Sequence, residues 1–207
     1  MALALAATPF SSTWAEDQAV PPPAAPAAAP VMPAPAALAA PAPAPVVPPM
    51  AVPDLDPGDF VWHPERSAAG PVEIVVSIPD QLVYVYRGGT LIAASTVSTG
   101  RPGHRTPTGD FRILEKDRNH HSNKYNNAPM PFMQRLTMDG IALHAGQIPG
   151  HPASHGCVRL PLAFARNLFG VTAVGANVHI LGASVTPETA LRIARNELPA
   201  SIQIASR

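Results

Sequence analysis

The stretch VEIVVSIPDQLVYVYRGGTLIAASTVS, residues 72–98, decides the fold of this chain. It holds three runs rich in β-branched and aromatic residues, a composition typical of strands. A Pro-Asp-Gln turn at residues 79–81 ends the first run, and Gly88-Gly89 joins the second run to the third, which is a strong signal for a two-residue hairpin. The expected strands are residues 72–78, 82–87 and 90–98. The stretch therefore predicts a β-meander.

Shorter apolar runs follow the meander and predict further strands, at residues 111–114, 133–138, 141–144 and 177–181. Residues 99–111 are crowded with glycine and proline, so we expect a structured loop there. Residues 118–132 are polar and rich in asparagine, and we expect a long loop that covers or borders a site.

Two segments carry helix signals. Residues 162–169 have apolar residues at helical spacing and are followed by Gly170, which we expect to end the helix. Thr186 and Pro187 have the N-cap and first-position signals of a second helix that reaches about residue 198. The many strands and few helices predict a mainly β fold with one packed helix and a C-terminal helix.

Proline and alanine dominate the region before the meander. Residues 21–57 hold 14 of the 27 prolines and 13 alanines, and such a segment favours extended polyproline II. Residues 1–15 combine an apolar run with small residues at Thr13 and Ala15, so we expect a truncated signal peptide. The expected segments are a signal peptide at 1–15, a disordered Pro/Ala-rich linker at 16–59, a folded domain at 72–183, and a helix with a tail at 184–207.

Charge and cysteine content narrow the function classes. All 14 Lys and Arg but only 10 of the 14 Asp and Glu lie beyond residue 58, which gives the folded part a net charge near +4 (14 − 10). This excess can favour an anionic substrate, or it is a solvated basic face. We expect no nucleic-acid partner and no transmembrane span in the domain. After residue 58 the sequence has no nucleic-acid-binding motif and no apolar run long enough to span a membrane. A single cysteine allows no internal disulfide.

The stretch IALHAGQIPGHPASHGCVRL, residues 141–160, contains the only cysteine, Cys157, and three of the eight histidines. A lone cysteine among histidines in a Gly/Pro-rich turn is typical of a thiol nucleophile. Its base can be His155, two residues away, or His144, thirteen residues away. We favour His144, because the base is usually brought to the nucleophile by the fold and not by adjacency. The alternative role for such a cysteine is that of a small buried core residue.

The residues around Cys157 suit an acyl substrate. Gly156 is expected to leave backbone N–H groups free, and the N–H of Cys157 itself is the natural donor to an oxyanion. Arg159 can hold a carboxylate of the substrate. Together with Ser154 and His155, these residues form the expected oxyanion and substrate-binding set.

The remaining histidines predict no metal site. His120 and His121 can be grouped with His144 as zinc ligands, but their spacing matches no zinc motif, so we expect no metal and no cofactor. His151 can contact the substrate, and His179 is expected to be structural, as is His63.

Two aromatic residues follow the Pro/Ala-rich region. Phe60 and Trp62 lie at its end, where an apolar ring can pack on the folded domain. We expect them to fasten the end of the linker to the domain.

SHGCVRL at residues 154–160 resembles the signature of the L,D-transpeptidase family, the YkuD-type catalytic domain. STGRPGHRTPTGDFRIL at residues 98–114 resembles a second marker of this family, and VEIVVSIPDQLVYVYRGG at residues 72–89 resembles its first strands. The resemblance covers about residues 72–182 and includes two separated motifs in the right order, which is more specific than either motif alone.

The resemblance implies a β-sandwich-like catalytic domain in which Cys157 is the nucleophile and His144 the general acid and base, oriented by a backbone carbonyl such as that of Ala145. It implies an exported enzyme of the periplasm or cell wall that attacks the diamino acid–D-Ala bond of a peptidoglycan stem tetrapeptide. A thioester forms, D-Ala leaves, and an amine takes the acyl group to give a 3→3 cross-link. Carbapenems acylate the same thiol in many members.

Two departures from the family pattern concern the acceptor. The spacer between His144 and Cys157 is shorter than in many members, and Arg159 stands where some members have Asn. The acceptor can therefore be a stem peptide, a wall-attached protein or water. With water, the protein is a carboxypeptidase or endopeptidase-type hydrolase on the same fold. A wall-binding module without activity is the third hypothesis.

Overall fold

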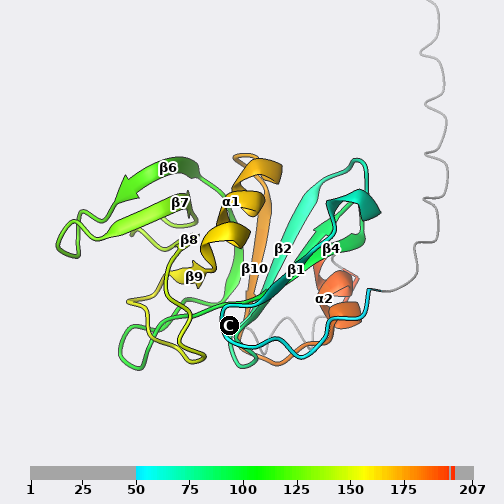
Figure 1. Ribbon diagram of the computed structural model, residues 1–207, viewed down its shortest axis with the longest axis horizontal. Coiled ribbons are helices and arrows are strands. Elements are labelled where there is room, and N and C mark those ends of the chain that lie inside the picture. Colours follow the sequence, from blue (N-terminus) through cyan, green and yellow to red (C-terminus); the bar gives the residue numbers. More distant parts are fainter. Residues whose placement is uncertain (1–49, 196, 199–207) are drawn as a thin grey trace, which may run out of the picture. The chain divides into compact units, whose positions relative to one another are not determined.

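The computed structural model describes residues 50–195 and 197–198, which fall within one compact unit, Pro45–Arg207 (Figure 1). Its elements are β1 (Phe60–Trp62), the 3-10 helix η1 (Pro64–Arg66), β2 (Val72–Ser77), β3 (Leu82–Arg87), β4 (Thr90–Thr96), β5 (Gly109–Arg112), β6 (Glu115–His121), β7 (Pro129–Arg135), β8 (Ala142–Ala145), β9 (Val158–Leu160), α1 (Leu162–Val171), β10 (Asn177–Leu181) and α2 (Pro187–Ala194). The expected signal peptide, most of the expected linker and the expected tail lie outside the described residues.

Within the described residues, the strands form a six-stranded sheet with the order β1-β4-β3-β2-β10-β5 and a four-stranded sheet with the order β6-β7-β8-β9. The predicted meander is confirmed, because β2, β3 and β4 are antiparallel neighbours. Gly88 and Gly89 between β3 and β4 have φ angles of +56° and +77°, the left-handed backbone that a type I′ hairpin turn requires. β10 returns parallel to β2, so the end of the domain pairs with its beginning. The fold is mainly β, as the sequence predicted.

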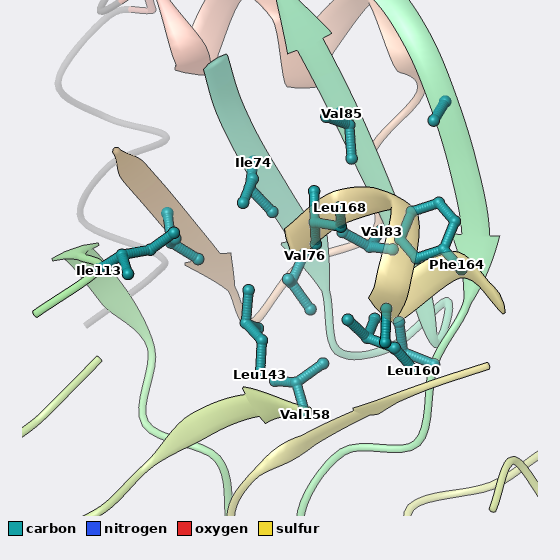
Figure 2. Packing of buried hydrophobic residues seen from close by; sticks show 14 of the residues in the cluster. Ile74, Val76, Val83, Val85, Ile113, Leu143, Val158, Leu160, Phe164 and Leu168 are labelled. Carbon is teal, nitrogen blue, oxygen red and sulfur yellow. The ribbon is translucent and has the colours of Figure 1, made fainter. Parts of the chain in front are cut away.

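The main hydrophobic core lies between the two sheets and includes α1 (Figure 2). It is built from apolar side chains of β2, β3, β4, β8, β9, β10 and α1, together with Ile113, which follows β5. The residues labelled in Figure 2 are Ile74, Val76, Val83, Val85, Ile113, Leu143, Val158, Leu160, Phe164 and Leu168. Burial of one large aliphatic side chain contributes about 1.5–3 kcal/mol. The apolar faces of β8 and β9 are therefore held firmly, which fixes the opposite faces of these two strands.

The second helix, α2, packs on the other face of the six-stranded sheet, against a cluster that includes Val75 and Tyr84. It begins as predicted, since the Thr186 hydroxyl accepts a hydrogen bond from the Thr189 N–H at 3.3 Å and Pro187 takes the first position. It ends at Ala194, four residues before the expected end.

The prediction that Gly170 ends the first helix is wrong. α1 runs through Gly170 to Val171 and ends where Thr172 adopts an extended backbone. The last carbonyls of α1 are bonded by distant or following side chains: Lys116 Nζ donates to Phe169 O at 2.7 Å, and the Thr172 hydroxyl donates to Leu168 O at 2.9 Å. The helix end is therefore set by tertiary partners and not by a glycine.

The prediction of a long loop at residues 118–132 is also wrong. This region forms the antiparallel hairpin of β6 and β7, with a turn at residues 122–128. No residue of β6 is fully buried, and its sequence, EKDRNHH, lacks the apolar alternation that marks a half-buried strand.

The aromatic residues expected to fasten the linker do contact the domain. β1 pairs with β4, and the rings of Phe60 and Trp62 lie edge-on to Phe164 at centroid distances of 5.6 and 5.5 Å. Just before β1, the Gly58 N–H donates to the Thr96 hydroxyl at 2.9 Å. Among the residues that the structure describes, there is no helix with the length and apolarity of a membrane span.

Candidate active site

β8 and β9 run parallel and bring the two ends of the 141–160 stretch together. Their register pairs Leu143 with Val158 and His144 with Arg159. Since paired residues on neighbouring strands project to the same face, Leu143 and Val158 enter the core while His144 and Arg159 project to the opposite face. Cys157 comes directly before β9 and packs with Met130, Met133 and Ala142 on that opposite face.

One cavity of about 490 Å³ is lined by the thiol and most of the predicted site residues. The predicted residues on its wall are His144, Ser154, His155, Cys157 and Arg159. The remaining wall is mostly apolar, with Pro129, Met130, Pro131 and Leu162 among its residues. The fold thus gathers the residues that sequence analysis selected, with Gly156 lying between two of them in the chain.

His144 is buried, with 8% of its surface exposed, and its Nδ1 lies 2.8 Å from the Ala145 carbonyl oxygen. A carbonyl oxygen only accepts hydrogen bonds, so Nδ1 carries the proton and Nε2 keeps a free lone pair. Burial is the main cause that lowers the pKa of His144 to about 4; the Ala145 bond opposes it, and the charge of Arg159 adds to it. His144 is therefore a neutral imidazole able to accept a proton. The Ala145 carbonyl makes the contact that the family resemblance implied.

Cys157 is half-buried, and its Sγ lies 3.6 Å from the Gly140 carbonyl oxygen. Burial raises the pKa of the thiol, while a hydrogen bond from the Ala142 backbone and the charges of Arg159 and Lys124 act in the opposite direction. Both the thiol and His144 are thus neutral near pH 7. Attack by sulfur then requires transfer of the thiol proton during the reaction, rather than a preformed thiolate–imidazolium pair.

The turn before Cys157 is locked by the Ser154 hydroxyl. It accepts from the Gly156 N–H at 3.0 Å and donates to the Cys157 carbonyl at 2.5 Å. The expectation of a free Gly156 N–H is therefore wrong, and the Cys157 N–H remains the candidate oxyanion donor. Gly156 has a φ of +117°, a backbone region that other residues rarely adopt, so this turn requires glycine.

The two sequence motifs are bonded to each other. Thr99 O accepts from the N–H groups of Ala153 and Ser154, both at 3.0 Å, and the Arg101 N–H donates to Ser154 O at 3.1 Å. The backbone of the loop at residues 98–106 therefore supports the turn before the thiol through these hydrogen bonds.

Tyr125, in the turn between β6 and β7, is a site residue that sequence analysis missed. Its ring packs on the His155 ring at a centroid distance of 4.5 Å, and the His104 ring lies edge-on to the same His155 ring at 4.9 Å. Tyr125 lines the main cavity and also a second one of about 310 Å³, which Lys124, Asp139 and Cys157 line as well. The only sequence signal was that Tyr125 is one of two aromatic residues, with Phe132, in the polar segment expected to border a site. The thiol thus lies on a wall that two cavities share.

The other histidines stand apart from the main cavity. His151 bonds within its own loop, with Nδ1 3.3 Å from Pro152 O, and it lines neither cavity. His120 lies near Asp117, and His121 near a backbone carbonyl. No group of three acidic, histidine or cysteine side chains within residues 50–195 and 197–198 has an arrangement that fits a metal ion. His179 lies buried between the carboxylates of Asp110 and Glu73, as expected of a structural residue.

Comparison with known families gives the class of protein that this fold and site define. The profile of the L,D-transpeptidase catalytic domain, YkuD, matches residues 71–180, which is more than half of the chain. The chain belongs to this enzyme family. No curated protein matches it.

Solved structures support the same fold. An L,D-transpeptidase from Mycobacterium smegmatis superposes with a TM-score of 0.51 at 20% identity, covering 54% of this chain and 58% of that one. One from Stackebrandtia nassauensis has a TM-score of 0.50 at 28% identity, with 56% and 57% covered. An LD transpeptidase in complex with imipenem has a TM-score of 0.50 at 23% identity, with 53% and 58% covered. The chain thus spans less than two thirds of the length of these relatives.

Proposed function

We propose that this protein is a peptidoglycan L,D-transpeptidase. The observation that carries the proposal is that Cys157 and His144 line one cavity while the Ala145 carbonyl holds the His144 proton on Nδ1. A thiol and an imidazole with a free Nε2 on the wall of one cavity are suited to acyl transfer through a thioester. Membership of the L,D-transpeptidase family supports a peptidoglycan stem tetrapeptide as the substrate.

In the proposed first half-reaction, Cys157 Sγ attacks the carbonyl carbon of the diamino acid–D-Ala bond, and His144 Nε2 takes the thiol proton. The carbonyl oxygen becomes an oxyanion that the Cys157 N–H stabilises. The intermediate then collapses, the C–N bond breaks, and His144 returns the proton to the nitrogen of D-Ala. The stem remains bound to Cys157 as a thioester.

In the proposed second half-reaction, an amine attacks the thioester carbonyl and gives a proton to His144 Nε2. Collapse of the intermediate breaks the C–S bond, forms an amide, and returns the proton to the sulfur. When the amine is the side-chain amine of a second stem's diamino acid, the product is a 3→3 cross-link. The acceptor must reach His144, as the departing D-Ala did, so both use the cavity that His144 lines.

Charge supports this use of the two cavities. Arg159 lines the His144 cavity, where its guanidinium can bind the carboxylate of D-Ala and then that of the acceptor. Lys124 lines the second cavity, where an ammonium group can bind a carboxylate of the donor stem. Because peptidoglycan lies outside the cytoplasmic membrane, we propose that the protein acts in the periplasm or cell wall.

The test is incubation of the purified full chain with a tetrapeptide stem, with and without a second amine-bearing stem, followed by mass spectrometry. The proposal predicts 3→3 linked dimers together with free D-Ala, and neither product from Cys157→Ala. Shortened monomers alone, in the presence of the acceptor, overturn the transferase in favour of the hydrolase. Absence of both products, or cross-linking by Cys157→Ala, overturns the proposal.

A further inference from the structure

The hydroxyl of Thr106 contacts the backbone beside the thiol. Thr106 is buried, and its Oγ1 accepts from the Gly100 N–H at 2.8 Å and donates to the Gly156 carbonyl at 2.9 Å. This side chain lines neither of the two cavities at Cys157, so it does not meet substrate itself. Its bond nevertheless ends on the peptide unit that carries the Cys157 N–H.

The Gly156–Cys157 peptide is held at one end by this bond. The described chain has no cis peptide bonds, so the C=O and N–H of this unit point in opposite directions. When Thr106 fixes the direction of the Gly156 carbonyl, the direction of the Cys157 N–H is fixed as well. Ser154 holds the groups on either side, the Gly156 N–H and the Cys157 carbonyl, but neither of its bonds reaches the peptide unit between them.

We infer that Thr106 is a positioning residue for the oxyanion donor, acting through the Gly156–Cys157 peptide. The inference rests on the proposed function, because it assigns an oxyanion to the reaction of Cys157. A hydrogen-bond donor that already points at the developing negative charge stabilises the transition state more than a donor that must first rotate into place. Loss of the Thr106 hydroxyl frees the peptide unit to turn, so the Cys157 N–H meets the oxyanion less well.

Two reactions of the same thiol separate this role from a structural one. Acylation by imipenem passes through a tetrahedral oxyanion at the carbonyl that sulfur attacks. Alkylation by iodoacetamide forms the S–C bond at a CH₂ carbon as iodide leaves, and no oxyanion develops there. A positioning role for Thr106 slows the first reaction and spares the second, whereas a change in the thiol or in its exposure alters both.

The experiment compares full-length Thr106→Val, which keeps the shape but loses the hydroxyl, with Thr106→Ser, which keeps the hydroxyl. Thr108→Val is the matched control, because Thr108 lies in the same loop, is half-buried and makes neither of the Thr106 bonds. Intact-mass time courses give both rates. We expect Thr106→Val to lower the acylation rate about 10–100-fold, with alkylation unchanged within about twofold. Thr106→Ser and Thr108→Val keep both rates.

The inference is overturned if Thr106→Val is acylated at the wild-type rate, or if acylation and alkylation fall by the same factor. If Thr106→Val does not fold, Thr106→Ala takes its place, and its acylation and alkylation rates are compared with those of Thr106→Ser. Loss of both rates in Thr106→Ser also overturns the inference. Failure of the proposed function gives a different result, since the wild-type protein then forms no imipenem adduct while iodoacetamide still reacts.

Discussion

The Nδ1 atom of His144 lies 2.8 Å from the carbonyl oxygen of Ala145, the next residue along β8. In Ser-His-Asp sites the corresponding partner is a carboxylate, whose charge stabilises the imidazolium. A carbonyl fixes the tautomer but supplies no net charge, so burial dominates and the pKa of His144 falls to about 4. The imidazole is therefore a neutral base at the pH values where the thiol begins to ionise.

His144→Asn tests the role of the imidazole. The asparagine amide can still donate to the Ala145 carbonyl, but it cannot take a proton from sulfur. We expect the rate of acylation by imipenem at pH 7 to fall about 10²–10⁴-fold. Rates from intact-mass time courses check this, with His151→Asn as control because His151 lines neither cavity. Acylation of His144→Asn at the wild-type rate would show that His144 does not accept the thiol proton.

The buried neutral His144 also predicts a stability change with pH. Its pKa is about 4 in the folded protein and about 6.5 in an unfolded chain, so between these values only the unfolded state binds the proton. The free energy of unfolding therefore decreases as pH falls through this window, by about 2–3 kcal/mol at pH 4.5 from this residue. Thermal unfolding at pH 7 and 4.5 should show a smaller loss of Tm for His144→Asn than for the wild type. Equal losses would contradict the burial of a neutral imidazole.

The raised pKa of Cys157 predicts the pH dependence of its alkylation. An ordinary thiol has a pKa of about 8.5. Because burial favours the neutral thiol of Cys157, the rate of reaction with iodoacetamide should keep rising beyond that pH. Arg159→Met should move the profile to still higher pH, since the guanidinium favours the thiolate. Arg192→Met, on exposed α2 surface, is the control and should leave it unmoved. A plateau below pH 8 would contradict the assignment.

Gly156 and Gly170 make a matched pair of substitutions. A Cβ at Gly156 would lie 2.8 Å from Ile141 Cδ1 on a backbone with φ +117°, so we expect Gly156→Ala to lower the free energy of unfolding by about 1–3 kcal/mol and to abolish acylation. A Cβ at Gly170 meets nothing within 4 Å, and alanine in a helix is favoured over glycine by about 0.5–1 kcal/mol. Gly170→Ala should therefore be neutral or stabilising and fully active. Chemical denaturation measures the free energy of unfolding of both variants, and equal values would contradict this prediction.

Local patterns in the sequence were enough for the long apolar strands β2, β3, β4 and β10, whereas β9 was not predicted. β3 and β10 have the predicted bounds, because their apolar runs end at turn residues. Cys157 and His144 were selected by residue type and motif, and the parallel pairing of β8 with β9 accounts for their place on the wall of one cavity. The β6–β7 hairpin was missed because β6 has no fully buried residue and its sequence, EKDRNHH, has no apolar period to detect.

Contacts between segments that are distant in the sequence could not be predicted from local sequence patterns. Lys116 bonds the end of α1 from 53 residues away, and Thr106 bonds Gly156 across 50 residues. Such bonds depend on the relative placement of two loops or of a strand and a helix, which neither segment encodes alone. Tyr125 is a similar case, because its stacking on His155 follows from the hairpin that sequence analysis took for a loop.

The proposed function requires that Cys157 is a nucleophile that accepts an acyl group. Intact-protein mass spectrometry after incubation with imipenem tests it most directly. We expect the wild-type protein to gain the mass of one imipenem molecule and Cys157→Ala to gain none. A wild-type protein without the adduct, or a Cys157→Ala variant that carries it, would contradict the proposed function.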